Sequence, residues 1–383
     1  MQRIKQLNAW FSYDCPVNIP DSPVMTIPFL FTQETGREEV GIIREHIHSA
    51  PFYPGSDSTI EENQSFRYVI FAPAGISRFN RAVIMLHGLN ERSWSKYLAW
   101  AEDLVLNCGI PVILFPIAFH MNRTPENWYT PRWLQPWLNR RKQEIKNLVN
   151  ASFANVALSS RLTASPLRFF SSGMESAFNL NQLVREIKEG KHPLFREDAG
   201  VDFFAYSIGA LLTQVNMMAD VDGYLKDSRL FAFCGGSVFE RMNGNARDII
   251  DQEAYNTIRS YYLNDFLNKE FYENTRETNS GLLFETAFKN MIPSNDASGI
   301  RQVFFAGAKD RIKMVSLKQD VVMPTIGLQE AVGVKLSDHM LEELDFSYPY
   351  SHQVPFPENG KVSESEIRES FRAVFDRAAS FLV

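Results

Sequence analysis

Residues 201–219 read VDFFAYSIGALLTQVNMMA. The first five, Val201–Ala205, form a short apolar run that predicts a strand buried on both faces of a parallel sheet. A helical stretch, Gly209–Ala219, follows directly, so Ser207 occupies a sharp turn between strand and helix. Small residues stand two positions before and after it, as they must where strand and helix approach closely. The stretch therefore predicts a nucleophile elbow that lifts the Ser207 hydroxyl clear of the sheet.

Similar apolar runs recur along the chain, and helical stretches separate several of them. The other runs expected to form strands are Arg67–Ala72, Ala82–Leu86, Val112–Phe115, Leu230–Phe233, Val303–Ala306 and Leu341–Phe346. The helical stretches are Ser95–Cys108, which stops at Gly109, Ser176–Lys188, and a last helix that opens with Ser363 and Glu366 in capping-box spacing. This alternation predicts an α/β fold with a mostly parallel, twisted sheet of about eight strands, flanked by helices.

Two segments are far longer than the alternation requires. Residues 118–172 hold three tryptophans, and residues 238–300 look helical and rich in aromatics. Long insertions in a compact α/β domain are usually lids or binding loops. We expect two helical cap insertions at the carboxyl edge of the sheet, where open α/β sheets bind ligands; peripheral packing helices are the alternative. Residues 1–65 are an N-terminal extension that could supply edge strands, and residues 66–383 form the core.

A serine hydroxyl needs a general base, and the base needs an acid to orient it. On a nucleophile elbow these partners follow the serine in the order acid, then histidine. Asp310 comes just after the run Val303–Ala306 and is the predicted acid; the alternative is a turn aspartate that binds local N–H groups.

The base must be chosen among seven histidines. His352 lies between the last expected strand and the last helix, where the base belongs, and His339 is the second choice. An imidazole with its ordinary pKa of about 6.5 can accept and return a proton near neutral pH. The remaining five precede Ser207 in the chain: His46, His48, His87, His120 and His192.

The run Ala82–Leu86 ends in a His87-Gly88 turn. Residues after such a turn can present a backbone N–H to the oxygen that becomes negative during acyl transfer. Leu89 is the first choice and Asn90 the second, with the Ile208 N–H as the other donor of this oxyanion site. The His87 ring is expected to hold the turn in place.

In their order along the chain, these motifs resemble the α/β-hydrolase superfamily from about residue 66 to the end. They are Leu86-His87-Gly88, Ala205-Tyr206-Ser207-Ile208-Gly209, Gly307 to Asp310, and Ser351-His352. The resemblance implies a cap over the site, Ser207 as nucleophile, His352 as base, Asp310 as acid, and Leu89 and Ile208 as oxyanion donors. Ala205 departs from the more usual glycine by a single methyl group.

Composition narrows the function classes. The 383 residues carry a net charge of −6, which argues against nucleic acid as the main partner. No apolar run suits a signal peptide or reaches the roughly 20 residues that span a bilayer, so we expect a cytoplasmic protein with no membrane span. The histidines and the three cysteines lack metal-ligand spacing, and no glycine loop cradles a phosphate, so no metal or cofactor is expected.

The leading hypothesis is a serine hydrolase that cleaves a carboxylic ester or thioester of a small-molecule acyl substrate through an acyl-enzyme. Two alternatives stay open: a non-catalytic ligand-binding protein on a hydrolase scaffold, and an amide or peptide hydrolase. The sequence indicates no oligomeric state.

Overall fold

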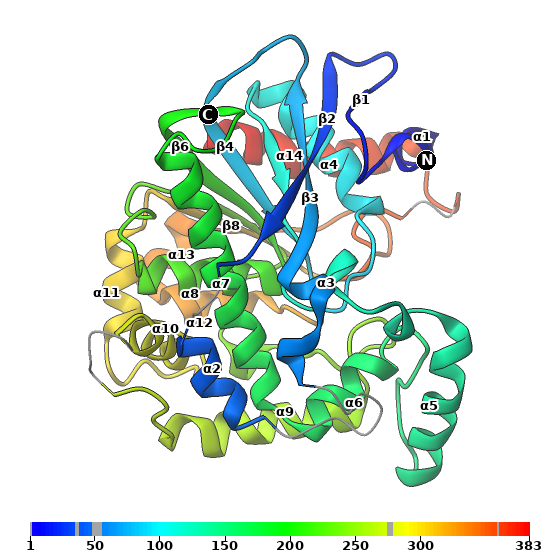
Figure 1. Cartoon of the computed structure of the whole chain (residues 1–383), viewed down its shortest axis with the longest axis vertical. Helices are drawn as coiled ribbons and strands as arrows, with labels where there is room; N and C mark the ends of the chain where they lie inside the picture. The colour runs from blue at the N-terminus through cyan, green and yellow to red at the C-terminus, as the bar shows by residue number, and fades with distance from the viewer. Residues whose placement is uncertain (1, 35–37, 48–55, 274–278, 358–359) are drawn as a thin grey trace.

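A nine-stranded sheet runs through the part of the chain that the structure describes (Figure 1). The computed structural model describes residues 2–34, 38–47, 56–273, 279–357 and 360–383. The strands follow one another across the sheet in the order β1-β2-β3-β5-β4-β6-β7-β8-β9. Their bounds are β1 Val17–Asn18, β2 Val24–Thr32, β3 Ser65–Pro73, β4 Phe79–Leu86, β5 Val112–Leu114, β6 Phe195–Tyr206, β7 Leu230–Phe233, β8 Ile312–Leu317 and β9 Leu341–Leu344.

The sheet is parallel from β5 across to β9 and antiparallel at the β1–β2–β3 edge. Residues 17–32 supply β1 and β2, and β2 pairs with β3 along its whole length. Six of the seven expected strands overlap strands of the structure. The strand order, with Ser207 at the turn after β6, is the α/β-hydrolase arrangement, so the predicted fold class is confirmed.

Fourteen α-helices occur in the described residues, and they cover both faces of the sheet and its lower end in Figure 1. Their bounds are α1 Gln2–Trp10, α2 Glu38–Glu45, α3 Glu61–Gln64, α4 Ser95–Cys108, α5 Pro131–Glu144, α6 Val156–Ala164, α7 Leu167–Lys188, α8 Ile208–Ala219, α9 Gln252–Ser260, α10 Asn279–Asn290, α11 Ile300–Gly307, α12 Thr325–Val332, α13 Val334–Met340 and α14 Glu364–Leu382. None of these helices combines the length and the apolar character that a membrane crossing requires.

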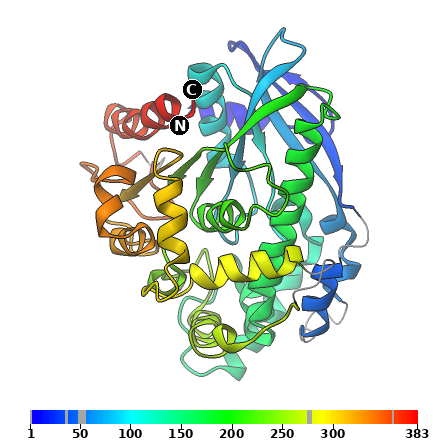
Figure 2. The ribbon, with the colours of Figure 1, turned by 90° about the vertical axis from the view of Figure 1, so that its left-hand side faces the viewer.

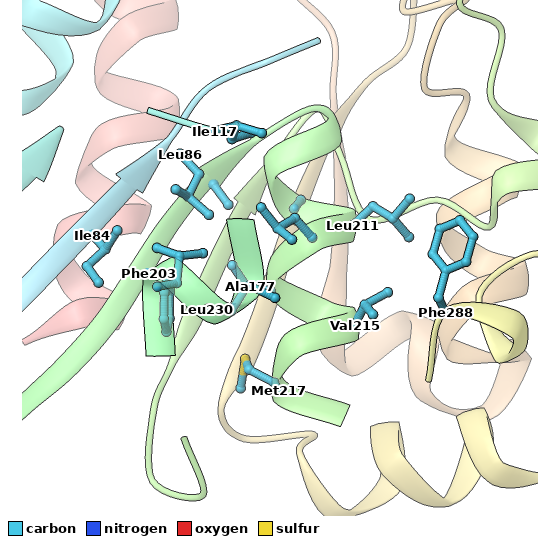
Figure 3. Packing of buried hydrophobic residues seen from close by; sticks show 14 of the residues in the cluster. Ile84, Leu86, Ile117, Ala177, Phe203, Leu211, Val215, Met217, Leu230 and Phe288 are labelled. Carbon is cyan, nitrogen blue, oxygen red and sulfur yellow. The ribbon is translucent and has the colours of Figure 1, made fainter. Parts of the chain in front are cut away.

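Two buried clusters lie on opposite faces of the sheet because successive strand residues point to opposite sides. Val83 and Met85 of β4 pack with α4 and α14, which lie side by side in Figure 2. Ile84 and Leu86 point the other way, toward α7 and α8. Figure 3 shows this second cluster, with Leu211 of α8 among its members. The apolar runs read from the sequence are therefore buried on both faces.

Helix ends follow the expected signals. The α4 helix stops at Gly109, whose φ of 65° is the left-handed conformation typical of a helix C-terminus. The α14 helix begins with a complete capping box, in which the Ser363 side chain accepts from the Glu366 N–H and Glu366 reaches back to the Ser363 N–H.

The expectation of a strand at Val303–Ala306 is wrong, because these residues lie within helix α11. Asp296 begins this helix by accepting hydrogen bonds from the N–H groups of Gly299 and Gln302. Val303 is 75% exposed, as suits a residue on the outer face of a surface helix and not a central strand. The strand next to β7 is instead β8, which starts at Ile312.

The two long segments together form a helical layer at the lower end of the sheet in Figure 1. Residues 118–172 contain α5 and α6, and residues 238–300 contain α9, a π-helical turn at Tyr261–Asp265, and α10. Helix α6 packs against α9. Arg141 of α5 forms a buried ion pair with Asp251, the N-cap of α9, at 2.6 Å. The layer is thus held by contacts between the two segments.

Candidate active site

Ser207 lies at the turn between β6 and α8 with a strained backbone. Its φ of 56° and ψ of −122° fall in a region that residues with a side chain rarely adopt. The turn is tight, because a Cβ added at Gly209 would lie 2.8 Å from the Leu86 Cβ and 2.9 Å from the His87 carbonyl oxygen. A Cβ at Gly235 would clash with the Ser207 carbonyl oxygen. Glycine at these two positions allows the elbow to form.

His352 approaches Ser207 from the loop between β9 and α14. Its Nε2 lies 2.7 Å from the Ser207 Oγ, and both residues are almost fully buried. Tyr206, next to the serine, stacks its ring on the imidazole at 5.3 Å and donates its hydroxyl hydrogen to the His352 carbonyl oxygen. The loop that carries His352 is therefore tied to the end of β6.

Asp320 is the carboxylate that holds the imidazole. Its Oδ2 lies 2.7 Å from the His352 Nδ1, and its Oδ1 accepts from the N–H groups of Val322 and Met323 at 2.9 Å each. Burial alone raises the pKa of Asp320, but the imidazole and these N–H groups outweigh it and hold that pKa below its ordinary value. An ionised carboxylate only accepts, so Nδ1 carries the imidazole proton. In the neutral ring Nε2 is then bare and accepts the hydrogen of the Ser207 hydroxyl.

The prediction that Asp310 is the carboxylate beside His352 is wrong, because Asp320 holds that place. Asp310 lies after helix α11, is exposed, and pairs with His339 of α13, which is also exposed, at 2.9 Å. The error follows from the misplaced strand, since Asp310 precedes β8 and lies at the end of the strand away from Ser207. Asp320 follows the carboxyl end of β8. The signal that could have found it is the mainly apolar run IKMVSL at residues 312–317, with an aspartate three residues beyond.

The turn after β4 places Leu89 beside the serine, and both line one cavity. The Leu89 N–H has no hydrogen-bond partner among the described residues. The Ile208 N–H begins α8, where no intrahelical acceptor exists. The Asn90 side chain donates to the Ala154 and Asp248 carbonyl oxygens at 2.8 and 2.9 Å, which ties this turn to both long insertions.

The His87 ring holds the turn, as expected. Its Nε2 accepts from the Ile117 N–H at 3.0 Å, so its Nδ1 donates to the Gly88 carbonyl oxygen at 2.8 Å. Full burial lowers the pKa of His87 well below the ordinary value and keeps the ring neutral. Of the other histidines that precede the serine, His48 lies outside the described residues.

Two small apolar cavities, each of about 40 Å³, meet beside the serine. Leu89, Phe169 and Ile208 line both of them. The first, which we call the serine cavity, also has Ser207 in its wall; its further lining includes Phe239, Met242, Ile249, Ile258, Val322 and Met323. The second, the inner cavity, extends between α7, α8 and α10; its lining includes Ile117, His120, Phe170, Leu211, Val215 and Phe288. Figure 3 shows Leu211 and Val215 pointing from α8 toward Phe288.

The described residues contain no group of three or more His, Cys, Asp or Glu side chains placed to hold a metal ion.

The model of one protein family, the family of unknown function DUF6051, matches residues 39–383. The chain belongs to the DUF6051 family. No curated protein matches this DUF6051 sequence at a significant level.

Solved structures similar to the DUF6051 chain include three esterases. Carboxyl esterase 2 of the mycorrhizal fungus Tuber melanosporum has 9% identity and a TM-score of 0.44, over 100% of this chain and 96% of that one. Acetyl xylan esterase 1 of Thermoanaerobacterium sp. JW/SL YS485 has 13% identity and a TM-score of 0.43, over 100% and 92%. A thermostable esterase of Pseudomonas putida ECU1011 has 10% identity and a TM-score of 0.40, over 100% and 86%.

Proposed function

We propose that this protein is a serine hydrolase that cleaves a carboxylic ester or thioester with an apolar acyl group. The observation that supports the proposal is the chain of two 2.7 Å contacts from Ser207 through His352 to Asp320, at the wall of an apolar cavity. A hydroxyl, a neutral imidazole and an ionised carboxylate in this order are what an acyl-transfer nucleophile requires.

In the first step the Ser207 oxygen attacks the acyl carbon while its proton passes to the His352 Nε2. The imidazolium that forms is stabilised by Asp320, which stays ionised because its pKa is held low. The carbonyl oxygen becomes negative, and the Leu89 and Ile208 N–H groups are the proposed donors to it. Asn90 is the less favoured donor, because its side chain already binds the two insertions.

In the second step the tetrahedral intermediate collapses and the bond to the leaving oxygen or sulfur breaks. His352 returns its proton to that atom, which departs as an alcohol or thiol. Water then attacks the acyl-serine, gives one proton to His352, and releases the carboxylic acid as Ser207 regains its hydrogen. The two steps together consume one water molecule and require no oxidant, reductant or cofactor.

The walls of the serine cavity favour an apolar acyl group. The side chains of Phe239, Met242 and Ile249 line it, and a charged group placed against them would lose its hydration. Arg259 is the charged side chain in the lining, and its guanidinium already donates to the Glu240 carbonyl oxygen. The cavity is small, so we expect slender acyl chains to react faster than bulky ones.

The direct test is labelling by a fluorophosphonate probe combined with turnover of p-nitrophenyl butyrate. We expect the probe to label Ser207 and the Ser207→Ala variant to lose both labelling and turnover. Ser93→Ala, which removes an exposed hydroxyl elsewhere, is the matched control and should keep both.

Three outcomes separate the hypotheses. Labelling and turnover that depend on Ser207 support the hydrolase. Equal background rates in the wild type and in Ser207→Ala, together with no labelling, would overturn it in favour of a non-catalytic binding protein. Faster turnover of matched amides than of esters would replace the ester or thioester assignment by an amide hydrolase.

A further inference from the structure

His120 is a buried histidine that the proposed reaction does not use. It lies on the loop after β5, is 5% exposed, and forms part of the wall of the inner cavity and of another cavity whose lining includes Arg92 and Arg161. Its Nδ1 lies 2.9 Å from the Ala118 carbonyl oxygen, which only accepts, so Nδ1 carries the ring proton. Nε2 is then a bare acceptor, and within the described part of the chain it has no hydrogen-bond partner.

The loop that carries His120 is held in one position by buried side chains. Three successive N–H groups, those of Ile117, Ala118 and Phe119, donate to the His87 Nε2, the Ser176 Oγ and the Asn63 Oδ1 at 2.9 to 3.0 Å. The residues on either side of His120 both have positive φ, 61° at position 119 and 50° at position 121. Strain of this kind persists only where the surroundings enforce it, and it clusters at functional sites.

Burial keeps this imidazole neutral. Loss of hydration lowers the pKa of His120 to about 4, so the ring does not take up a proton at neutral pH. Nε2 therefore stays an acceptor over the range in which most enzymes work. A buried acceptor without a donor is costly, and native structures rarely leave one unexplained.

We propose that the His120 Nε2 accepts a hydrogen bond from a hydroxyl group on the acyl part of the substrate. The enzyme then selects apolar acyl groups that carry one hydroxyl. This inference rests on the proposed function, because the acyl group starts at Ser207.

The two cavities form the path by which an acyl chain attached at Ser207 could reach His120. Leu89, Phe169 and Ile208 line both, so an acyl chain attached at Ser207 passes these residues to enter the inner cavity. There its apolar body meets side chains such as Leu211 and Phe288. Besides His120, the polar side chain in this lining is Ser172, and the other side chains are apolar. A fixed acceptor in such a largely apolar pocket binds a hydroxyl well and rejects the analogue that lacks it.

The test uses two series of p-nitrophenyl esters whose acyl chains have matched lengths and end in either a hydroxyl or a methyl group. With the wild-type protein, the hydroxyl series should show a kcat/KM about tenfold to a hundredfold higher at the length that reaches His120. The higher kcat/KM of the hydroxyl series should come mainly from a lower KM, because the contact exists both in the bound substrate and in the transition state.

Two variants at position 120 assign the preference to the acceptor. His120→Phe keeps an aromatic ring and removes the acceptor, so it should abolish the preference for the hydroxyl series over the methyl series at that chain length. His120→Gln offers an amide oxygen and should restore part of the preference.

The outcomes separate this inference from the proposed function. Turnover that depends on Ser207 but shows no hydroxyl preference at any length in the wild type overturns the role of His120 alone. A preference that survives unchanged in His120→Phe does the same. A lack of Ser207-dependent turnover in both series overturns the proposed function, and this inference with it.

Discussion

At the scale of single residues, Asp320 fixes which nitrogen of His352 carries the proton. Asparagine in its place can donate to Nδ1 and so favour the tautomer with the proton on Nε2, which cannot accept from Ser207. We expect Asp320→Asn to lower kcat by about 10⁴-fold with little change in KM. Steady-state turnover of p-nitrophenyl butyrate by the wild type and the variant measures both kcat and KM.

Asp310 offers a matched control for that variant. It is exposed and pairs with His339, whereas Asp320 is the carboxylate that contacts His352. Asp310→Asn should keep kcat within about twofold of wild type, since exposed ion pairs contribute little. The opposite ranking, with Asp310→Asn the more damaging, would mean that the carboxylate assignment is wrong.

Tyr206 is a positioning residue for the same imidazole. Its hydroxyl holds the His352 carbonyl oxygen, and the loss of one such hydrogen bond costs about 1 kcal/mol, or about fivefold in rate. We therefore expect Tyr206→Phe to lower kcat severalfold with KM nearly unchanged. Tyr224→Phe, which removes a surface hydroxyl that contacts Glu189, is the control and should leave kcat intact. A Tyr206→Phe variant with wild-type kcat would exclude this role.

The sequence predicted two of the three residues that the structure brings together. Ser207 is marked by its local motif, and His352 by its place between the last strand and a capped helix. Asp320 carries no local mark, since aspartates after apolar runs are common, and only correct strand assignment selects it. The catalytic roles of all three stay predictions.

At the scale of elements, the approach of β4 to α8 depends on Gly209. A methyl group there would press on Leu86 and on the His87 carbonyl oxygen, and forced overpacking costs about 1–3 kcal/mol. We expect Gly209→Ala to lower the free energy of unfolding by that amount, measured by urea denaturation. Gly41→Ala in α2 is the control: nothing lies within 4 Å of the added Cβ, so it should be neutral or stabilising by up to about 1 kcal/mol. Equal stabilities for the two variants would contradict the close approach.

The secondary structure was predictable where periodicity and length agreed. Long helices with caps, such as α4 and α14, and the runs of β4 and β6 were found from the sequence. Val303–Ala306 failed because four apolar residues fit a helix face as well as a strand. The deciding contact, Asp296 to the first turn of α11, lies outside the run itself.

At the scale of the whole molecule, buried neutral histidines make stability depend on pH. Burial lowers the pKa of both His120 and His192 to about 4. Between that value and the unfolded value of about 6.5, the unfolded chain binds more protons, so acid favours unfolding. Each of the two should remove about 2 kcal/mol from the free energy of unfolding between pH 7 and pH 5.

Equilibrium denaturation of wild type and His120→Leu at several pH values checks this contribution. The difference in stability between the two proteins should shift by about 2 kcal/mol in favour of the variant as pH falls from 7 to 5. Above pH 7 the difference should stay constant, which serves as the internal control. A difference that does not change with pH would show that His120 titrates alike in both states.

Most of the sheet was predictable because the apolar runs of β3, β4, β5, β6, β7 and β9 are visible in the sequence. The contacts that hold the helical layer together were not predictable. These contacts join residues far apart in the chain, such as Arg141 with Asp251, and no local pattern pairs them. The division of the chain at residue 66 and the role of the two insertions as caps stay predictions.

One amide group gives that layer a mechanical consequence. The Asn90 side chain donates hydrogen bonds to the carbonyl oxygen of Ala154 in one insertion and to that of Asp248 in the other. Any separation of residues 154 and 248 would break at least one of these two hydrogen bonds and loosen the turn that carries Leu89. The insertions could then not be apart while the Leu89 turn is held in the position that the structure shows.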